Sequence, residues 1–123
     1  MSLIQRELLI NTPAWDQKPV WIHADLLKPN ILIKENRISG IIDFGSAGVG
    51  DPAFDIIPAW AVFNSSSRKI FREKLDVNDA IWDRACAYAL HQAALIIPYY
   101  RESNPVFVKQ AVDTINEIVK DFV

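Results

Sequence analysis

Two short motifs in the first half of this sequence carry side chains that suit phosphoryl transfer. The first motif follows the pattern HxDxxxxN and reads His23-Ala24-Asp25-Leu26-Leu27-Lys28-Pro29-Asn30, and the second is Ile41-Ile42-Asp43-Phe44-Gly45. Phosphoryl transfer needs a carboxylate beside the accepting hydroxyl, and it needs oxygen ligands that hold Mg²⁺ on the nucleotide phosphates. Asp25, Asn30 and Asp43 supply these groups in the order expected of a kinase.

The residues around Asp43 indicate one family. From Ile42 onward the chain follows the pattern Ile-Asp-Phe-Gly-x-x-Gly-x-Gly-Asp-Pro-x-x-Asp, which ends at Asp55. This pattern resembles the aminoglycoside phosphotransferase family, whose members are small-molecule kinases built like protein kinases. Ala24 stands where protein kinases usually carry Arg, and it is also closer to that family. The resemblance implies a phosphotransferase that uses ATP and Mg²⁺ and transfers the γ-phosphate to a hydroxyl of a small molecule.

Three residues of the motifs have distinct expected roles. Asp25 is interpreted as the catalytic base, or as the carboxylate that orients the accepting hydroxyl. Asn30 and Asp43 are expected to bind Mg²⁺ and, through it, the nucleotide phosphates. We therefore predict that all three side chains converge on one cleft. A metal-dependent phosphohydrolase that uses His23, Asp25 and Asp43 is an alternative, but such sites usually need further ligands.

Lys28, His23 and Asp55 are expected to assist the site. Lys28 either neutralises charge on the transferred group or points into solvent, and we count it among the candidate nucleotide-binding residues. The resemblance implies that His23 packs beneath the catalytic loop and that Asp55, a buried helix residue, anchors the backbone of that loop. We therefore predict that Asp55 is buried and accepts hydrogen bonds from the backbone near His23. Zinc is excluded because His91 and Cys86 are too few partners.

The rest of the sequence predicts an α+β fold that is mostly helical. The resemblance implies the C-terminal lobe of a protein-kinase-like fold, with a small β-hairpin at the active site. Apolar spacing and turn residues predict a helix over 3–9, a strand over Val20–Ile22, a hairpin over 31–42 and a tight turn over 45–50. Further helices are expected over 51–63, where Pro58 kinks or breaks the helix, over 68–75, where residues 65–67 provide the cap, and over 78–97. A last helix is expected from Pro105 onward. Its apolar stripe consists of Val108, Val112, Ile115, Val119 and Phe122.

Composition is consistent with one domain over residues 1–123. Half of the residues are hydrophobic, and 13 Lys and Arg against 15 Asp and Glu leave a net charge of −2, so no basic surface favours a nucleic-acid partner. The single cysteine fits a reducing cytoplasm, where we expect the protein to act. The sequence has no signal peptide and no apolar run long enough to span a membrane.

A kinase of this type also needs an N-terminal lobe with a glycine-rich turn and a lysine that covers the phosphates. The stretch before Val20 contains no glycine, so we interpret the chain as a partial kinase that lacks this lobe, and we expect it to be inactive alone. The alternative is a non-catalytic lobe remnant that serves as a binding or self-associating module. Apolar surface exposed by the missing lobe favours homo-oligomers.

The sequence leaves the small-molecule hydroxyl acceptor open. Asp76, Asp79 and Asp83 recur at helical spacing. They either form an acidic wall for a cationic acceptor such as an aminoglycoside, or they belong to a solvated helix start, where acidic residues are favourable.

Overall fold

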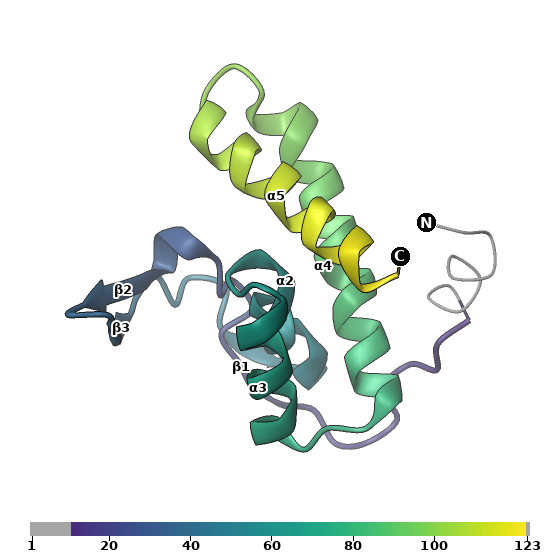
Figure 1. The fold of residues 1–123 in the computed structure, drawn as a ribbon. Helices are drawn as coiled ribbons and strands as arrows, with labels where there is room; N and C mark the ends of the chain where they lie inside the picture. Colours follow the sequence, from purple (N-terminus) through teal and green to yellow (C-terminus); the bar gives the residue numbers. More distant parts are fainter. Residues whose placement is uncertain (1–10, 123) are drawn as a thin grey trace.

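The computed structural model describes residues 11–122, so the helix expected over residues 3–9 lies outside the described residues. Within this range the chain forms two small antiparallel sheets followed by helices (Figure 1). The elements run in the order β1 (Val20–Ile22), η1 (Lys28–Asn30), β2 (Ile31–Lys34), β3 (Arg37–Ile41), β4 (Gly48–Gly50), η2 (Pro52–Ile56), α2 (Pro58–Ala61), α3 (Ser65–Leu75), α4 (Asp79–Tyr100) and α5 (Pro105–Asp121). The described part of the chain is therefore α+β and mostly helical, as predicted.

The expected hairpin is present and projects away from the helices (Figure 1). β2 and β3 pair antiparallel, with Ile31 opposite Ile41 at the base of the hairpin. The amide of Ile42 donates to the carbonyl oxygen of Asn30 at 3.0 Å and extends the pairing by one bond. Asn30 and Asp43 therefore flank the same end of the hairpin.

The tight turn predicted over 45–50 is only partly correct. The amide of Ala47 donates to the carbonyl oxygen of Phe44 at 3.0 Å, which closes the turn early. The residues after it extend into β4, where Val49 lies opposite Trp21 of β1. An edge strand with free backbone groups pairs with any extended neighbour, and β1 is such a strand.

The helix predicted over 51–63 is split at Pro58. Asp51 caps the first part, η2, by accepting a hydrogen bond from the amide of Ala53 at 2.9 Å. Pro58 has no amide hydrogen to continue the helix, but it suits the first turn of a new one, and α2 begins there.

Two predictions about later helix ends are also corrected. The helix expected over 68–75 begins at Ser65, because Asn64 and not the serine run provides its N-cap, through a capping box with Ser67. α4 continues through Pro98 to Tyr100. Near the end of a helix a proline removes only a local hydrogen bond, so the helix tolerates it.

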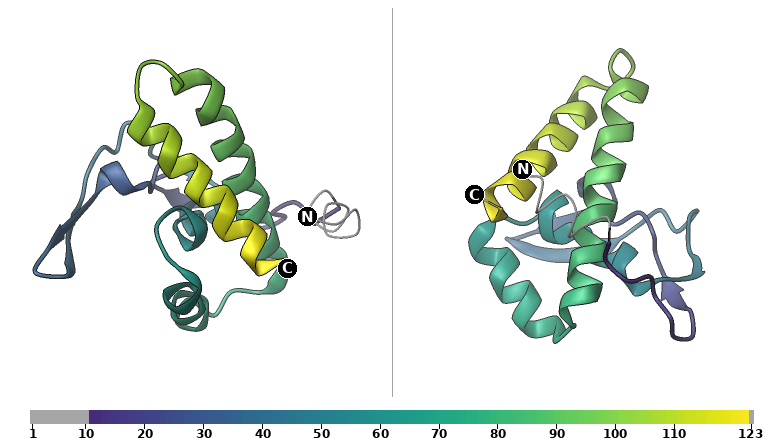
Figure 2. Two further views of the ribbon diagram at one scale, coloured as in Figure 1. Left: turned by 45° about the horizontal axis from the view of Figure 1, so that its top comes forward. Right: turned by 90° about the vertical axis from the view of Figure 1, so that its right-hand side faces the viewer.

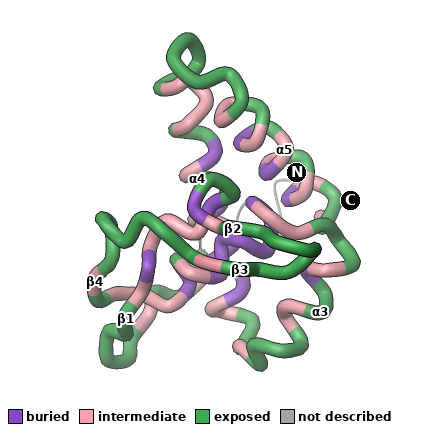
Figure 3. The backbone as a smooth tube through the Cα atoms, turned by 90° about the vertical axis from the view of Figure 1, so that its left-hand side faces the viewer, coloured by how far each residue is buried: buried purple, intermediate pink, exposed green. Residues whose placement is uncertain are grey.

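Buried residues gather where η2 and α2 meet α4 and α5 (Figure 3). α5 returns beside α4 as an antiparallel partner (Figure 2). Trp60 of α2 lies at the centre of this core, with its ring centroid 4.9 Å from that of Trp82. Small buried residues recur every four positions on α4, namely Ala85, Ala89 and Ala93, which lets neighbouring elements approach this helix closely.

The apolar stripe predicted on α5 is wrong by part of a turn. The buried residues of this helix are Ala111, Thr114 and Ile118, whereas Val112 is 41% exposed. At about 100° per residue, Val108, Val112 and Val119 all lie to one side of this buried face, so hydrophobicity alone placed the centre of the stripe too far round the helix. The small Ala111 and the polar Thr114 fit the contact because Thr114 donates its hydroxyl to the carbonyl oxygen of Gln110 at 3.0 Å.

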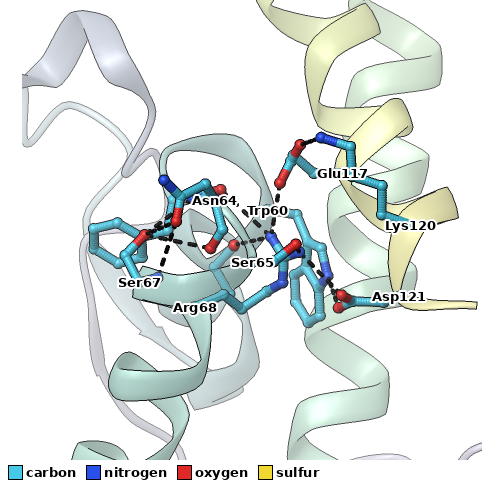
Figure 4. A network of polar contacts seen from close by, with 10 residues as sticks. Trp60, Asn64, Ser65, Ser67, Arg68, Glu117, Lys120 and Asp121 are labelled. Atoms are coloured by element: carbon cyan, nitrogen blue, oxygen red, sulfur yellow. Dashed lines mark hydrogen bonds and ion pairs between the residues drawn. The ribbon is translucent and has the colours of Figure 1, made fainter.

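A buried arginine ties α2, α3 and α5 together (Figure 4). The Arg68 side chain is 3% exposed and donates to the carbonyl oxygen of Ala59 and to Oδ1 of Asp121, both at 2.9 Å. Asp121 also accepts the indole N–H of Trp60 at 2.8 Å. A weaker contact of 3.4 Å joins Arg68 to Glu117. This network joins α2 and α3 to the C-terminal end of α5.

No helix within residues 11–122 has the length and apolar character needed to cross a bilayer.

The Arg68 network predicts a large loss of stability when its cation is removed. In Arg68→Met the carbonyl of Ala59 and the carboxylate of Asp121 lose their donor, and we expect the free energy of unfolding to fall by about 3 kcal/mol. Lys69→Met, at the exposed neighbouring position, should change it by less than about 0.5 kcal/mol. Urea unfolding of both variants measures the difference, and equal effects would contradict the role of Arg68.

Candidate functional site

Strand ends and one short helix bring three of the candidate residues into one pocket. Asp25 lies in the loop after β1, Asn30 ends η1, and Asp43 follows β3. These three residues line a pocket of about 210 Å³. The hairpin makes this possible, because its antiparallel strands return the chain to the level of Asn30. The structure thus brings together the three side chains for which the sequence predicts a common cleft.

Asn30 holds Asp25 in place. Its buried amide nitrogen donates to the backbone carbonyl of Asp25 at 2.9 Å and to the carboxylate oxygen Oδ2 of Asp25 at 3.0 Å. Both amide hydrogens are therefore directed at Asp25. Among the described residues Oδ1 of Asn30 accepts no hydrogen bond, so this oxygen is the atom available to a cation.

His23 is buried beneath the loop and uses both ring nitrogens in hydrogen bonds. Its Nδ1 accepts the amide hydrogen of Asp25 at 3.1 Å, so Nε2 carries the ring proton and donates to the carbonyl oxygen of Ile42 at 2.8 Å. The ring also packs edge-on against Phe44, with centroids 4.6 Å apart. His23 therefore links the loop that carries Asp25 to the segment that carries Asp43.

Asp55 makes the hydrogen bonds expected of it. Its Oδ2 accepts the amide hydrogen of His23 at 2.8 Å, and its Oδ1 accepts that of Ala24 at 2.9 Å. The prediction that Asp55 is buried is only partly correct, because the residue is half-buried. The two amide hydrogens satisfy its carboxylate oxygens, and this pairing does not require that the residue be fully enclosed.

The backbone is strained at two positions of the site. Ala24 has a φ of 70° and Asp43 a φ of 62°, in the left-handed region that residues with a side chain seldom adopt. Such conformations cost about 1–3 kcal/mol and persist where the surroundings impose them. The hydrogen bond from Ala24 to Asp55 imposes one of them. Ala24 directly precedes Asp25, and Asp43 is itself one of the candidate site residues.

Arg84 and Tyr88 support the site, although the sequence analysis did not select them. Arg84 of α4 makes a bidentate contact with Asp51, through Nε at 2.8 Å and one terminal nitrogen at 3.2 Å. The hydroxyl of Tyr88 donates to the same carboxylate at 2.9 Å. The signal available in the sequence was an arginine and a tyrosine four positions apart in an otherwise alanine-rich helix.

This cluster determines the ionisation of Asp51. Burial raises the pKa of the Asp51 carboxyl, but hydrogen bonds from Arg84, from the amide of Ala53 and from Tyr88 outweigh burial and leave the pKa below its ordinary value of 3.8. The charged carboxylate therefore fixes the start of η2, and η2 carries Asp55 to the catalytic loop.

The structure does not bring every candidate to the pocket. Lys28 lines a neighbouring hollow between α2 and α5, together with Asn64 and Glu117, and is not among the residues that line the pocket of Asp25. Asp79 pairs with Arg72 at 2.6 Å, and Asp83 lines a different pocket beside Trp82.

Comparison with known proteins identifies the family. Residues 3–92, which contain both motifs, match the family described as the phosphotransferase enzyme family, APH. The chain belongs to the phosphotransferase enzyme family. This membership agrees with the resemblance that the sequence motifs suggested.

Individual relatives of this phosphotransferase family chain match over shorter stretches. The mitogen-activated protein kinase hog1 of Aspergillus terreus is 35% identical over 68 residues, which is 55% of this chain and 19% of that kinase. HOG1 of Saccharomyces cerevisiae is 35% identical over the same length, 16% of its own chain. The uncharacterized protein YcbJ of Bacillus subtilis is 29% identical over 94 residues, 64% of this chain and 31% of its own. The chain thus spans less than a third of each of these relatives. No solved structure matches it.

The Asp51 cluster predicts a pH dependence of stability. Because the folded pKa of Asp51 is lowered, its ionisation adds stability at pH values above the unfolded pKa near 3.8, and this contribution is lost as the pH falls through the folded pKa. Asp51→Asn should lower the free energy of unfolding at pH 7 by about 1–3 kcal/mol and flatten its decline between about pH 5 and pH 3.

Urea unfolding across this pH range measures both effects. Glu73→Gln, at an exposed position of α3, is the matched control and should keep the wild-type decline. If Asp51→Asn also kept the wild-type decline, the charge on Asp51 would not contribute to stability.

Proposed function

We propose that this chain carries the transfer site of an ATP-dependent phosphotransferase that acts on a hydroxyl group of a small molecule. The observation that carries the proposal is the single pocket lined by Asp25, Asn30 and Asp43. Their chemistry is that of a kinase site, with one carboxylate for the accepting hydroxyl and two oxygen donors for a cation. Membership of the phosphotransferase enzyme family supports the same chemistry.

In the proposed reaction Asp25 orients the accepting hydroxyl and receives its proton. The hydroxyl oxygen forms a bond to the γ-phosphorus of ATP, the bond from that phosphorus to the β–γ bridging oxygen breaks, and ADP leaves. The transition state of such transfers is loose, so orientation contributes more than early proton removal. The hydrogen bond that Asn30 donates to the Asp25 carboxylate and the one that His23 accepts from the Asp25 amide supply this orientation.

The residues of the pocket fit a Mg²⁺ ion. Oδ1 of Asn30 and the carboxylate of Asp43 are oxygen donors, and Mg²⁺ usually takes one or two protein ligands of this kind together with phosphate oxygens and water. No group of three His, Cys, Asp or Glu side chains within residues 11–122 is arranged to hold a metal. When bound, the ion neutralises charge on the phosphates.

We also propose that the chain forms part of the C-terminal lobe of a kinase-like fold and that the groups covering the nucleotide lie outside residues 11–122. Neither lysine nor arginine lines the described pocket, so cationic contacts to the phosphates must come from elsewhere. We therefore expect the 123-residue chain to turn over little ATP by itself. The relatives named above are several times longer than the matched stretch.

The proposed role of Asp25 is tested in the longest form of the protein that shows acceptor-dependent ADP release. Asp25→Asn keeps the size of the side chain and its contact with Asn30 but removes the charge, and it should lower kcat by about 10²–10⁴-fold. ATP binding should stay within about twofold, because Asp25 is not proposed as a metal ligand. Asp113→Asn, at a half-buried position of α5 that does not line this pocket, should leave kcat unchanged. Full turnover by Asp25→Asn would refute the assignment.

A second candidate function is that of a binding or self-associating module. The observation that favours it is a set of exposed apolar side chains on the sheets and the segment between them, namely Trp21, Ile33, Ile38, Phe44 and Val49. Trp21 alone is 81% exposed. Apolar side chains that are exposed to water favour association with another apolar surface. We propose that a second copy of the chain covers this surface when nothing else does.

Sedimentation velocity of the 123-residue chain over a range of concentrations tests the self-association. We expect a concentration-dependent dimer or larger species, and Trp21→Ser should weaken the association at least tenfold, or about 1.4 kcal/mol. Leu95→Ser removes an exposed apolar side chain from α4 and serves as the control. A chain that remains monomeric at all concentrations would contradict the proposal.

A further inference from the structure

The pocket that contains Asp25 has a second wall, which comes from the connection between α4 and α5. Tyr100 ends α4, Asn104 caps α5, and Phe107 lies in the first turn of α5, and all three line the same pocket as the motif residues. The match to the phosphotransferase enzyme family ends at residue 92. The second wall therefore lies in a part of the chain that the family match does not cover.

Aromatic contacts fix the orientation of this wall. The Tyr100 ring packs edge-on against Phe107, with centroids 5.1 Å apart, and against Tyr99, with centroids 4.8 Å apart. Rings held in this way form a rigid apolar face, and small-molecule pockets use such faces beside a few polar groups. Tyr99 itself is 79% exposed and does not line the pocket.

The same wall offers neutral hydrogen-bonding groups. Oδ1 of Asn104 accepts the amide hydrogen of Phe107 at 3.1 Å, which fixes the side chain and leaves its NH₂ group as a donor. Within residues 11–122 the Tyr100 hydroxyl has no hydrogen-bond partner. A phenol and an amide donor suit hydroxyl oxygens of a ligand.

The charges near the pocket do not suit a polycation. The carboxylates that line it belong to Asp25 and Asp43, and the proposed function assigns one to the reacting hydroxyl and the other to Mg²⁺. Asp83 lies 17 positions before Tyr100 on α4, which at a rise of about 1.5 Å per residue separates the two by about 25 Å. The acidic wall considered from the sequence therefore lies far from the transfer site.

We propose that Tyr100 and Asn104 select the acceptor and that the acceptor is a neutral hydroxylated ring, a monosaccharide or a cyclitol. The apolar C–H face of such a ring packs on Tyr100, its hydroxyl oxygens accept from Asn104, and one further hydroxyl reaches Asp25. This inference rests on the proposed function, because it takes the pocket of Asp25 to be the place where the acceptor binds.

Saturation-transfer NMR on the full 123-residue chain tests the inference with two matched probe pairs. One pair is glucose and glucosamine, and the other is scyllo-inositol and its dicationic diamino counterpart streptamine, each in about 0.15 M salt to screen unspecific attraction to the carboxylates. We expect transfer to the ring protons of the neutral member of each pair, equal to or greater than that of the cationic member. Stronger binding of the cationic members, or no transfer to any probe, overturns the proposal.

Two tyrosine variants separate the proposed contact from general effects on the fold. Tyr100→Ala should reduce the transfer signal at least fivefold, whereas Tyr99→Ala, the exposed neighbour of the same residue type, should keep most of it. Asn104→Ser retains an N-cap oxygen but lacks the amide donor, and it should weaken binding without changing the circular-dichroism spectrum. Equal losses in Tyr99→Ala and Tyr100→Ala would overturn the role of Tyr100.

The outcomes distinguish the inference from the function on which it rests. If the neutral rings bind as expected but Asp25→Asn keeps full turnover in the active protein, the proposed function fails. The binding of a neutral ring by Tyr100 and Asn104 is then still supported. If Asp25→Asn abolishes turnover but only cationic acceptors are phosphorylated, the function remains and the inference fails.

Discussion

The contact between Arg84 and Asp51 is the interaction on which the arrangement of the site depends. Both side chains are largely buried, and each needs the other, since an unpaired charge in that position would be strongly unfavourable. Asp51 fixes the start of η2, η2 presents Asp55, and Asp55 holds the backbone amides before Asp25. A helix far along the sequence thus determines where the reacting carboxylate lies. Because α4 also carries Tyr100, the same helix orders both walls of the pocket.

The strained backbone at the site is consistent with the dependence of the site on the helical part of the chain. Ala24 and Asp43 adopt left-handed conformations that an isolated peptide would avoid. Each is held by groups outside its own segment, Ala24 by Asp55 and the Asp43 segment by the hydrogen bond from His23 to Ile42. A site that needs such support forms only when the helical part of the chain is folded. Local order near the motifs is therefore a product of the global fold.

The sequence predicted features that depend on short-range chemistry. The hairpin followed from isoleucine-rich runs on both sides of a polar tip, and the helix starts near Asp51 and at Pro105 followed from residue type. The grouping of the three motif residues followed from the chemistry of the motifs. Features set by distant packing were not predicted. The pairing of β4 with β1, the position of the core face on α5, and the hold of Arg84 on Asp51 each depend on elements that meet only in three dimensions, and no local periodicity encodes them.

The position of the hairpin has a consequence for how this protein can vary. Asn30 and Asp43 both lie at the base, where Ile31 faces Ile41 and the amide of Ile42 bonds Asn30, while the tip at Glu35 and Asn36 points away from the helices. The distance between the oxygen donors of Asn30 and Asp43 is set by the first residue pairs of the hairpin and does not depend on the number of pairs beyond them. Insertions or deletions that add or remove whole residue pairs at the tip leave the geometry of these donors unchanged. The tip of the hairpin can therefore change in length or gain new contacts without moving the two oxygen donors.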